Sequence, residues 1–179
     1  MPAPAPAVAL RAATTDDLAW LTALACSAEV EPFLATGAAA GLAEALAGDE
    51  ILIATVDDAP VGAVRAVVTN HRSRIAAIRT LMVDPAVRGR GIGAAVIRAV
   101  TARLVDAGAI HRVEAEVYGF NAGGLRAFAA AGFAPEGRRR RAYDRHGDWQ
   151  DGVLLAYLAD EPPAPTGPPG GGRSSSRVP

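Results

Sequence analysis

The sequence predicts an α/β domain built around a mixed sheet. Several short runs are rich in β-branched residues, two longer segments carry apolar residues at helical spacing, and glycine, proline or aspartate separate them. These segments follow the order strand, one or two helices, three strands, helix, strand, helix and two strands, which is typical of α/β proteins. A length of 179 residues fits one such domain.

The N-terminal half is expected to hold the first strand, the short helices and three further strands. Thr14–Asp17 can cap a helix whose apolar positions are Leu18, Leu21 and Leu24. Asp57–Pro60 reads as a turn between two β-rich runs, which therefore form a hairpin. In order, the predicted elements are a strand at 8–12, helices at 18–26 and 41–47, and strands at 51–56, 61–69 and 75–83.

The C-terminal half is expected to alternate helices and strands. Apolar residues at Ile92, Val96, Val100 and Leu104 are four apart and so lie on one face of a helix. Asn121 can cap a second helix. The predicted elements are a helix at 93–107 ended by Gly108, a strand at 113–118, a helix from Asn121 to Gly132, and strands at 133–143 and 150–158 joined by a turn at 144–148.

Both ends of the chain have compositions typical of unfolded segments. Residues 1–7 alternate alanine and proline, and residues 161–179 are dominated by proline, glycine and serine, so neither can bury enough apolar surface to offset its ordering entropy. The folded domain is therefore expected at 8–160. No run approaches the length of a membrane span and the start lacks the pattern of a secretory signal, so a cytoplasmic protein is expected.

The segment from Val83 to Ala94 is the sharpest local feature. A strand ends, and a loop containing Gly89, Gly91 and Gly93 opens an amphipathic helix. Glycines allow close approach of backbone N–H groups to an anion, and the helix start adds unpaired donors, so the segment predicts a pyrophosphate site supported by Arg88 and Arg90. The same letters fit a dinucleotide-binding fingerprint, but that reading is rejected because residues 84–88 intervene between strand and glycines and too little chain follows for a doubly wound sheet.

This loop resembles the Q/R-x-x-G-x-G/A signature of the GNAT N-acetyltransferase superfamily. Asn121, followed by Leu125, Phe128 and Gly132-Phe133, resembles that family's second cofactor-contacting helix. The ending, with Glu136-Gly137, Trp149 and Asp151, is similar to members that acetylate protein N-termini, polyamines or small amines. The resemblance implies a mainly antiparallel sheet splayed between its fourth and fifth strands and flanked by helices. It also implies transfer of an acetyl group from acetyl-CoA to a primary amine without a metal.

The resemblance further assigns cofactor contacts. The pantetheine arm is expected between the strand ending at Val83 and the strand at 113–118, where it adds to the exposed backbone. Asn121 is expected to cap its helix and also to hydrogen-bond the pantetheine. The implied cofactor-binding residues are Leu81, Met82, Val83, Arg88, Gly89, Arg90, Gly91, Ile92, Gly93, Ala94, Asn121 and Phe128.

Acid–base groups are expected on the strand at 113–118. Alternation places Glu114, Glu116 and Tyr118 on one face, which either meets the substrate cleft or is solvated. Glu116 lies five residues before Asn121, as does the catalytic glutamate of ribosomal-protein alanine N-acetyltransferases, and it is the candidate base. Many members have a tyrosine as general acid where this chain has Phe128, so Tyr118, Tyr143 or water takes that role, or the domain only binds an acyl-CoA.

The remaining predictions concern the acceptor and other partners. By resemblance, Glu29, Glu31 and Phe33 wall the acceptor cleft, while the acceptor amine and the oligomeric state, a homodimer among the options, stay open. The arginines at 138–141 are interpreted as a solvated strand, and a net charge of −1 favours neither nucleic acid nor membranes. Cys26 is expected to be a small buried residue. The three histidines lack the spacing of metal ligands.

Overall fold

The computed structural model describes residues 7–35, 37–48, 51–106 and 110–161. The predicted leader and the predicted tail lie outside the described residues, apart from Ala7 and Glu161. The predicted helix end at Gly108 also lies outside them, because the described part of that helix ends at Asp106.

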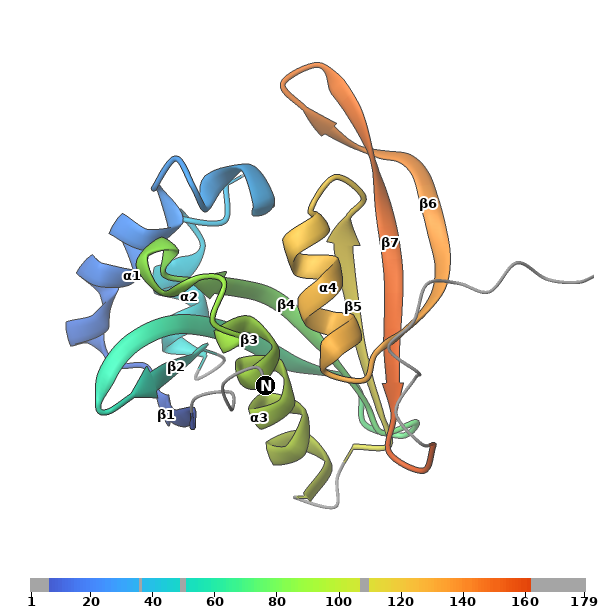
Figure 1. Ribbon diagram of the computed structural model, residues 1–179, viewed down its shortest axis with the longest axis horizontal. Helices are drawn as coiled ribbons and strands as arrows, with labels where there is room; N and C mark the ends of the chain where they lie inside the picture. Colours follow the sequence, from blue (N-terminus) through green and yellow to red (C-terminus); the bar gives the residue numbers. More distant parts are fainter. Residues whose placement is uncertain (1–6, 36, 49–50, 107–109, 162–179) are drawn as a thin grey trace, which may run out of the picture.

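A seven-stranded sheet forms the centre of the molecule, in the order β1-β2-β3-β4-β5-β7-β6 (Figure 1). Its strands are β1 (Ala9–Ala12), β2 (Ile51–Val56), β3 (Ala59–Asn70), β4 (Ile75–Val83), β5 (Arg112–Tyr118), β6 (Ala134–Arg145) and β7 (Asp148–Leu158). Neighbouring strands are antiparallel except β4 and β5, which are parallel. A helix connects these two strands and returns the chain to the same starting edge, as a parallel pair requires. The predicted mixed, mainly antiparallel sheet is confirmed.

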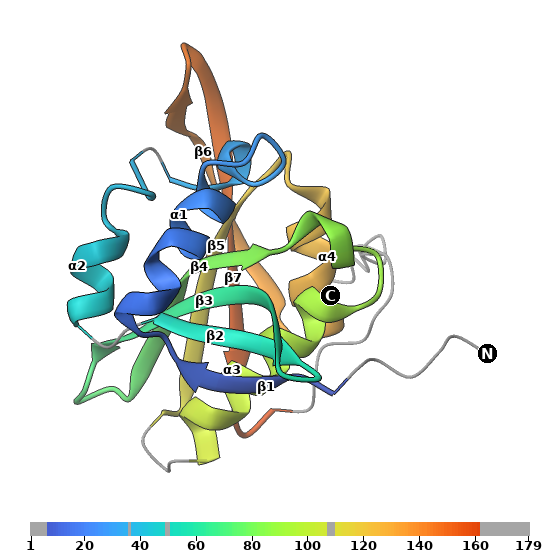
Figure 2. The same cartoon turned by 90° about the vertical axis from the view of Figure 1, so that its left-hand side faces the viewer.

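Helices cover both faces of this sheet (Figures 1 and 2). They are α1 (Leu18–Ala25) and α2 (Leu42–Ala47) on one face, and α3 (Ile92–Asp106) and α4 (Ala122–Ala130) on the other, with short 3-10 turns η1 (Thr15–Asp17), η2 (Glu31–Phe33) and η3 (Pro85–Val87). Asp17 organises the entry to α1: its carboxylate accepts hydrogen bonds from the Thr14 backbone N–H at 2.8 Å and from the Arg11 side chain at 2.7 Å. The Arg11 guanidinium accordingly holds the pKa of Asp17 well below its ordinary value.

Two hairpin turns are tighter than the sequence indicates. Asp57 and Asp58 both have positive φ, 49° and 63°, and so do His146 and Gly147, at 57° and 87°. Two successive left-handed residues make a two-residue turn whose twist matches the flanking strands. The strands therefore extend closer to each turn than predicted, with β3 starting at Ala59, β6 reaching Arg145 and β7 starting at Asp148.

Each helix layer has its own core. The core under α3 and α4 includes Val96, Val100 and Phe128 with Val113 of β5, while the core under α1 and α2 includes Leu21. The second core takes its sheet residues from β2, β3 and β4: Ile51, Ile53, Ala63 and Met82. The same face of β5 is not covered by that core, and its outward residues line a cavity instead. This arrangement leaves room for a site beside α1 and α2.

Two surface features complete the description. The Cys26 prediction is wrong: this thiol is exposed, because Cys26 follows the last residue of α1 and the buried face of that helix is formed by Leu21, Leu24 and Ala25. Among the described helices, none combines the length and apolar character needed to span a bilayer.

Candidate active site

The sheet opens between β4 and β5. These strands are paired only from Ile75 to Ile78 and from Arg112 to Ala115, although β4 continues to Val83 and β5 to Tyr118. A β-bulge starts the separation, because Arg65 pairs with Thr80 and Ala66 with Ile78, which leaves Arg79 as the extra residue. The predicted splay between the fourth and fifth strands is therefore present.

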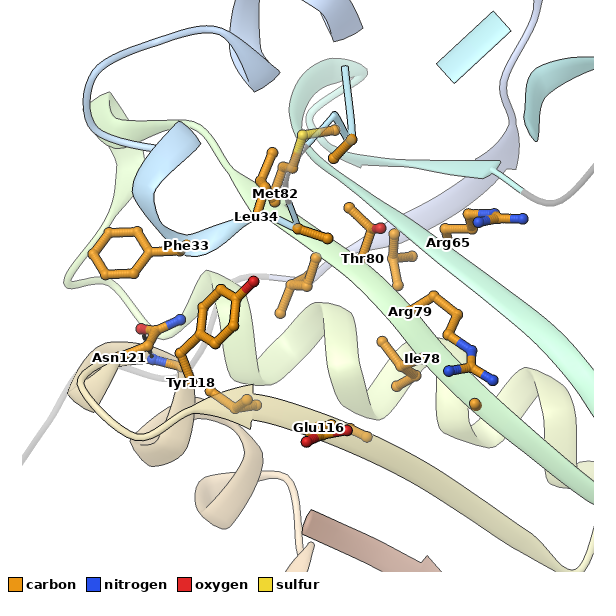
Figure 3. Close-up of a pocket in the computed structure, with 18 of the residues that line it drawn as sticks. Phe33, Leu34, Arg65, Ile78, Arg79, Thr80, Met82, Glu116, Tyr118 and Asn121 are labelled. Carbon is orange, nitrogen blue, oxygen red and sulfur yellow. Dashed lines mark hydrogen bonds between the residues drawn. The ribbon is translucent and has the colours of Figure 1, made fainter. Parts of the chain in front are cut away.

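A cavity of about 600 Å³ lies at this opening (Figure 3). Its lining comes from strands β2 to β7, from α1, α2 and the segment between them, and from α4. Of the predicted site residues, it includes Phe33, Leu81, Met82, Glu116, Tyr118, Asn121 and Phe128. Residues separated by almost a hundred positions in the sequence thus meet at one place. The face carrying Glu116 and Tyr118 lines this cavity, and Glu116 on it is also exposed.

The glycine loop lies next to the start of α3. Gly89 and Gly91 have φ of 78° and 79°, which is the left-handed conformation that glycine adopts without strain. The first hydrogen bond of the helix runs from the Ala95 N–H to the Gly91 carbonyl, so the N–H groups of Ile92, Gly93 and Ala94 have no acceptor within the helix. Such a helix start attracts an anion through these donors and through the positive end of the helix dipole.

The other side chains of the loop have structural roles. Ile92 and Ala94 are buried in the sheet-facing side of α3, so only their backbone can meet a ligand at the loop. Gly93 faces α4, since a Cβ there would lie 3.4 Å from the Cβ of Ala127. Arg88 donates to the Glu29 carbonyl at 2.9 Å and to the Val83 carbonyl at 3.2 Å, and so ties the loop to the segment after α1. Arg90 is exposed.

Glu116 is the central acidic group of the cavity. Its carboxylate accepts a hydrogen bond from the Arg139 guanidinium at 3.0 Å, and the same guanidinium donates to the Tyr143 hydroxyl at 3.2 Å. Burial, and then the nearby Glu116 carboxylate, raises the pKa of Tyr143 to about 12. Tyr143 therefore keeps its proton at neutral pH, and the Glu116 carboxylate lies beside the permanent cation of Arg139.

Gly152 of β7 makes this arrangement possible. A Cβ at residue 152 would lie 2.0 Å from Oε1 of Glu116 and 2.9 Å from Cε2 of Tyr143. A side chain at residue 152 would have to displace Glu116, so the two groups approach each other across the bare backbone of β7. The sequence alone offers no sign that Gly152 differs from a glycine that merely interrupts a strand.

A wide bulge in β6 brings Arg139 and Tyr143 together. Arg139 pairs with Gly152 and Tyr143 with Gln150, so β6 advances four residues while β7 advances two. Arg141 adopts a positive φ of 49° within the bulge, and its N–H donates to Asp151 at 2.8 Å. The Asp151 carboxylate also accepts from Arg138 at 3.0 Å, and the Arg141 N–H and Arg138 hold its pKa below the ordinary value.

The arginine run therefore differs in part from its predicted role. Arg138 and Arg139 are exposed, as expected for a solvated strand, but they also bind Asp151 and Glu116. Neither the contact of Asp151 with Arg138 nor the pairing of Arg139 with Glu116 is predicted from the sequence. These pairings depend on the bulge register, for which a run of four identical residues contains no signal.

Aromatic side chains cluster at the cavity, and Phe33, Tyr118 and Tyr143 among them line it. The Tyr118 ring stacks on Phe120 with centroids 5.4 Å apart, and Phe120 meets Phe33 at 5.9 Å. The Tyr118 ring also meets Tyr143 edge-on at 5.2 Å. In Figure 3 the Tyr118 hydroxyl points into the cavity between β4 and β5. This cluster gives the cavity an apolar wall next to its charged groups.

The predicted acceptor residues separate into different environments. Phe33 lines the cavity, but Glu31 binds Arg145 at 3.2 Å, and the backbone carbonyl of Glu29 binds Arg88. Arg145 is buried under η2, donates to the Leu34 carbonyl at 3.0 Å, and lies 5.7 Å from the Tyr118 ring centroid. Glu31 thus helps to anchor η2 to the β6–β7 hairpin. Of the three residues, only Phe33 is part of the described cavity lining.

Asn121 and Phe128 connect the cavity to α4. The Asn121 side chain accepts from the Gly124 N–H at 2.8 Å, which confirms its predicted role as the helix cap. Phe128 is 4% exposed and meets Phe133 edge-on at 5.0 Å. Phe128 is thus a core residue that also borders the cavity.

Comparison with known proteins agrees with this geometry. A probable N-acetyltransferase, YjcK of Bacillus subtilis (strain 168), is 36% identical over 75 residues, which cover 42% of this chain and 41% of that protein. The match thus spans about two fifths of the relative's length. A structure of Mycobacterium smegmatis RimJ in complex with CoA-disulfide superposes with a TM-score of 0.73 at 26% identity, over 87% of this chain and 84% of RimJ.

A third comparison shows the fold alone. Spermidine N-acetyltransferase from Vibrio cholerae, solved with CoA and spermine, has a TM-score of 0.73 at 17% identity, over 85% of this chain and 95% of that one.

Residues 18–133, more than half of the sequence, match the acetyltransferase (GNAT) family, and they include the glycine loop, the splayed strands and Glu116. The resemblance seen in the motifs is confirmed, and the chain belongs to the acetyltransferase (GNAT) family.

Proposed function

We propose that this chain transfers the acetyl group of acetyl-CoA to a primary amine of a small molecule or peptide N-terminus by direct attack. The observation that carries the proposal is the position of Glu116 in a cavity at the opening between β4 and β5. Relatives in the family fit this activity: one is a probable N-acetyltransferase, and RimJ was solved with a coenzyme A disulfide.

The residues present suit a coenzyme A thioester. The pyrophosphate would meet the N–H groups of Ile92, Gly93 and Ala94, which lack acceptors in α3, and the open backbone edge of β4 would pair with the pantetheine arm. When bound, the thioester supplies an acetyl carbon open to attack and a thiolate leaving group. The backbone N–H near Leu81 would be the donor that stabilises charge developing on the thioester oxygen.

Glu116 is assigned as the base that takes the proton of the incoming ammonium, directly or through water. An alkylamine has a pKa of about 10, so at neutral pH it must lose a proton before it can attack. A carboxylate in the cavity beside Arg139 serves this purpose and also attracts the cationic amine. One proton of the ammonium goes to Glu116 or solvent before the attack. As the nitrogen–carbon bond forms and the carbon–sulfur bond breaks, the nitrogen loses a second proton, which balances the proton that the thiolate takes up.

Tyr118 is assigned as the acid that protonates the departing thiolate. Its hydroxyl points into the cavity, whereas the Tyr143 hydroxyl faces Arg139 and Glu116. Tyr118→Phe should lower turnover by about 10- to 100-fold and leave coenzyme A affinity unchanged, because only the proton donor is lost. Tyr157→Phe is the matched control, since Tyr157 packs on Phe133 outside the described cavity lining. Equal activity of Tyr118→Phe and the wild type would exclude this assignment.

The test of the proposal separates cofactor binding from turnover. Coenzyme A should bind in calorimetry and raise the melting temperature, because a ligand specific to the folded state stabilises it by mass action. A panel of primary amines and N-terminal peptides with acetyl-CoA should then release free thiol above the solvent background. No binding at millimolar coenzyme A would rule out the cofactor site as well as the reaction.

The alternative function is an acyl-CoA-binding sensor or partner domain without turnover. Phe128 favours it, because this buried ring stands where many family members have the tyrosine acid. Under that alternative, coenzyme A binds and no amine in the panel releases thiol. Thiol release with any amine decides in favour of the transferase.

The glycine loop gives a separate prediction. Gly91→Val should weaken coenzyme A binding by about 10- to 100-fold, because a branched side chain is strained at a φ of 79° and fills the approach to the N–H groups of α3. The Michaelis constant for the amine should change far less. Gly147→Val is the control for backbone strain, since Gly147 has a φ of 87° and nothing within 4 Å of an added Cβ. Unchanged coenzyme A affinity in Gly91→Val would place the pyrophosphate elsewhere.

A further inference from the structure

Arg79 occupies a defined place at the start of the opening in the sheet. Ile78 and Ala115 form the last pair of the parallel strands β4 and β5, so Arg79 and Glu116 are the next residues of each strand. Partners in a parallel pair point to the same side, and Ile78 and Ala115 both belong to the core under α3 and α4. Arg79 and Glu116 are therefore directed to the opposite face, where both line the cavity (Figure 3).

The other charged groups in the cavity lining are largely matched with each other. Glu114 binds Arg112 at 2.7 Å, Glu136 binds the same Arg112, and Glu116 binds Arg139. All three carboxylates of the described lining thus have an arginine partner. Arg79 is exposed and has no carboxylate partner among the residues that the structure describes.

We infer that Arg79 binds an anionic group of the acceptor, so that the acceptor is an amine carrying a nearby carboxylate, as an α-amino acid does. The inference rests on the proposed function and specifies its substrate class. Arg79 and Glu116 directly follow the last paired residues of β4 and β5, so a group held by Arg79 and an amine beside Glu116 would belong to one compact molecule. A planar guanidinium suits this role, because it can bind both oxygens of a carboxylate.

The β4 bulge supports this assignment. The extra residue in a bulge is unpaired in the ladder and its side chain is re-aimed, which is a recurrent device beside functional sites. In this structure the bulged residue is Arg79 itself, and its neighbour Thr80 also lines the cavity. Arg65 of β3 pairs with Thr80 and adds a second guanidinium to the same wall.

The same charges disfavour a polycation. A polyamine or aminoglycoside would have to place additional ammonium groups beside Arg79, while the carboxylates of the lining already bind arginines. Like charges brought together in a partly enclosed site reduce affinity. The chain should therefore differ in acceptor from the spermidine N-acetyltransferase that shares its fold.

The experiment compares acceptors that differ only in the carboxylate. A set of free amino acids, their primary amides and the corresponding decarboxylated amines is assayed for thiol release with acetyl-CoA, for the full chain and for Arg79→Gln. The wild type should prefer the free acids, and the ratio of kcat/KM between acid and amide should fall by about 10- to 100-fold in Arg79→Gln. Comparing this ratio between the wild type and Arg79→Gln cancels the intrinsic difference in amine basicity between acid and amide, because that difference is the same for both proteins. Spermidine should be a poor acceptor for the wild type.

Two further variants serve as comparisons for Arg79→Gln. Arg79→Lys retains the positive charge but lacks the paired N–H donors of a guanidinium, so its acid-to-amide ratio of kcat/KM should be intermediate. This variant also provides the test if Arg79→Gln folds poorly. Arg72→Gln removes an exposed arginine from the turn before β4 and should leave the ratio unchanged. Coenzyme A affinity, measured by calorimetry, should be the same in all three variants.

The outcomes distinguish this inference from the proposed function. An equal loss for acid and amide, or a wild type that prefers amides, decarboxylated amines or spermidine, overturns the carboxylate site while acetyl transfer stands. Thiol release from amines of other classes but from no free amino acid would also overturn the carboxylate site, while acetyl transfer stands. If no amine releases thiol at all, the transferase proposal itself fails.

Discussion

Glu116→Gln should lower turnover by roughly 10²- to 10⁴-fold, the usual contribution of a positioned base. The substitution preserves the shape of the side chain and removes its ability to accept the ammonium proton. Because Glu116 lies apart from the glycine loop, coenzyme A affinity should be unchanged. The expected measurement is thiol release at saturating acetyl-CoA, with cofactor binding followed separately.

The dependence of turnover on pH tests the assignment of Glu116 as the base in a second way. As the pH rises towards the amine pKa of about 10, more of the acceptor is neutral and needs no base. The defect of Glu116→Gln should therefore shrink at high pH. Glu114→Gln is the matched control, because Glu114 lies on the same face of β5 but binds Arg112, and its turnover should stay within a few-fold of the wild type. A Glu116→Gln protein with wild-type turnover across the pH range would refute the base assignment.

Gly152→Ala should reduce turnover by about 100-fold although it adds a single methyl group. The new Cβ would lie 2.0 Å from Oε1 of Glu116, so the carboxylate must move away. Because the obstructed atom is at the end of a flexible side chain, the domain should still fold and bind coenzyme A. Thermal unfolding and calorimetry check those two points, and steady-state kinetics measure the loss.

A control and a double variant separate displacement of Glu116 from general damage. Gly137→Ala adds a methyl group to β6, where the Cβ would lie 3.8 Å from Leu154 in ordinary contact, and should have little effect. If Gly152→Ala acts through Glu116, the Glu116→Gln, Gly152→Ala double variant should be no slower than the slower single variant. Additive losses in that double variant would show that Gly152 acts through another group.

Asp151 and Gly152 support the site from the edge of the sheet. The Asp151 carboxylate holds the N–H of Arg141 in its left-handed conformation, and Gly152 leaves space for Glu116 and Tyr143. Adjacent residues of β7 thus shape the bulge of β6 and the position of the proposed base. The proposed catalytic arrangement depends on β7 as much as on β5, where Glu116 itself resides.

The sequence by itself determined the class of fold and the main parts of the site. Helical spacing in α3, the runs of β-branched residues and the turn residues gave the element order, and alternation placed Glu116 and Tyr118 on one face of β5. The glycine loop and the Asn121 cap could be found because each is a local motif. Each of these patterns involves residues only a few positions apart, so it can be recognised in the sequence directly.

Only the tertiary structure decided which distant groups meet. The pairing of Glu116 with Arg139, the need for a glycine at residue 152 and the location of Arg79 all depend on strand register and on two β-bulges. Whether a strand face meets a cavity depends on which helices cover the neighbouring strands, as it does for β5 beside α1 and α2. Register and bulges are set by packing across the whole sheet, and a one-residue shift would turn every side chain to the other face. The local pattern therefore predicts the elements, whereas the contacts between them require the folded chain.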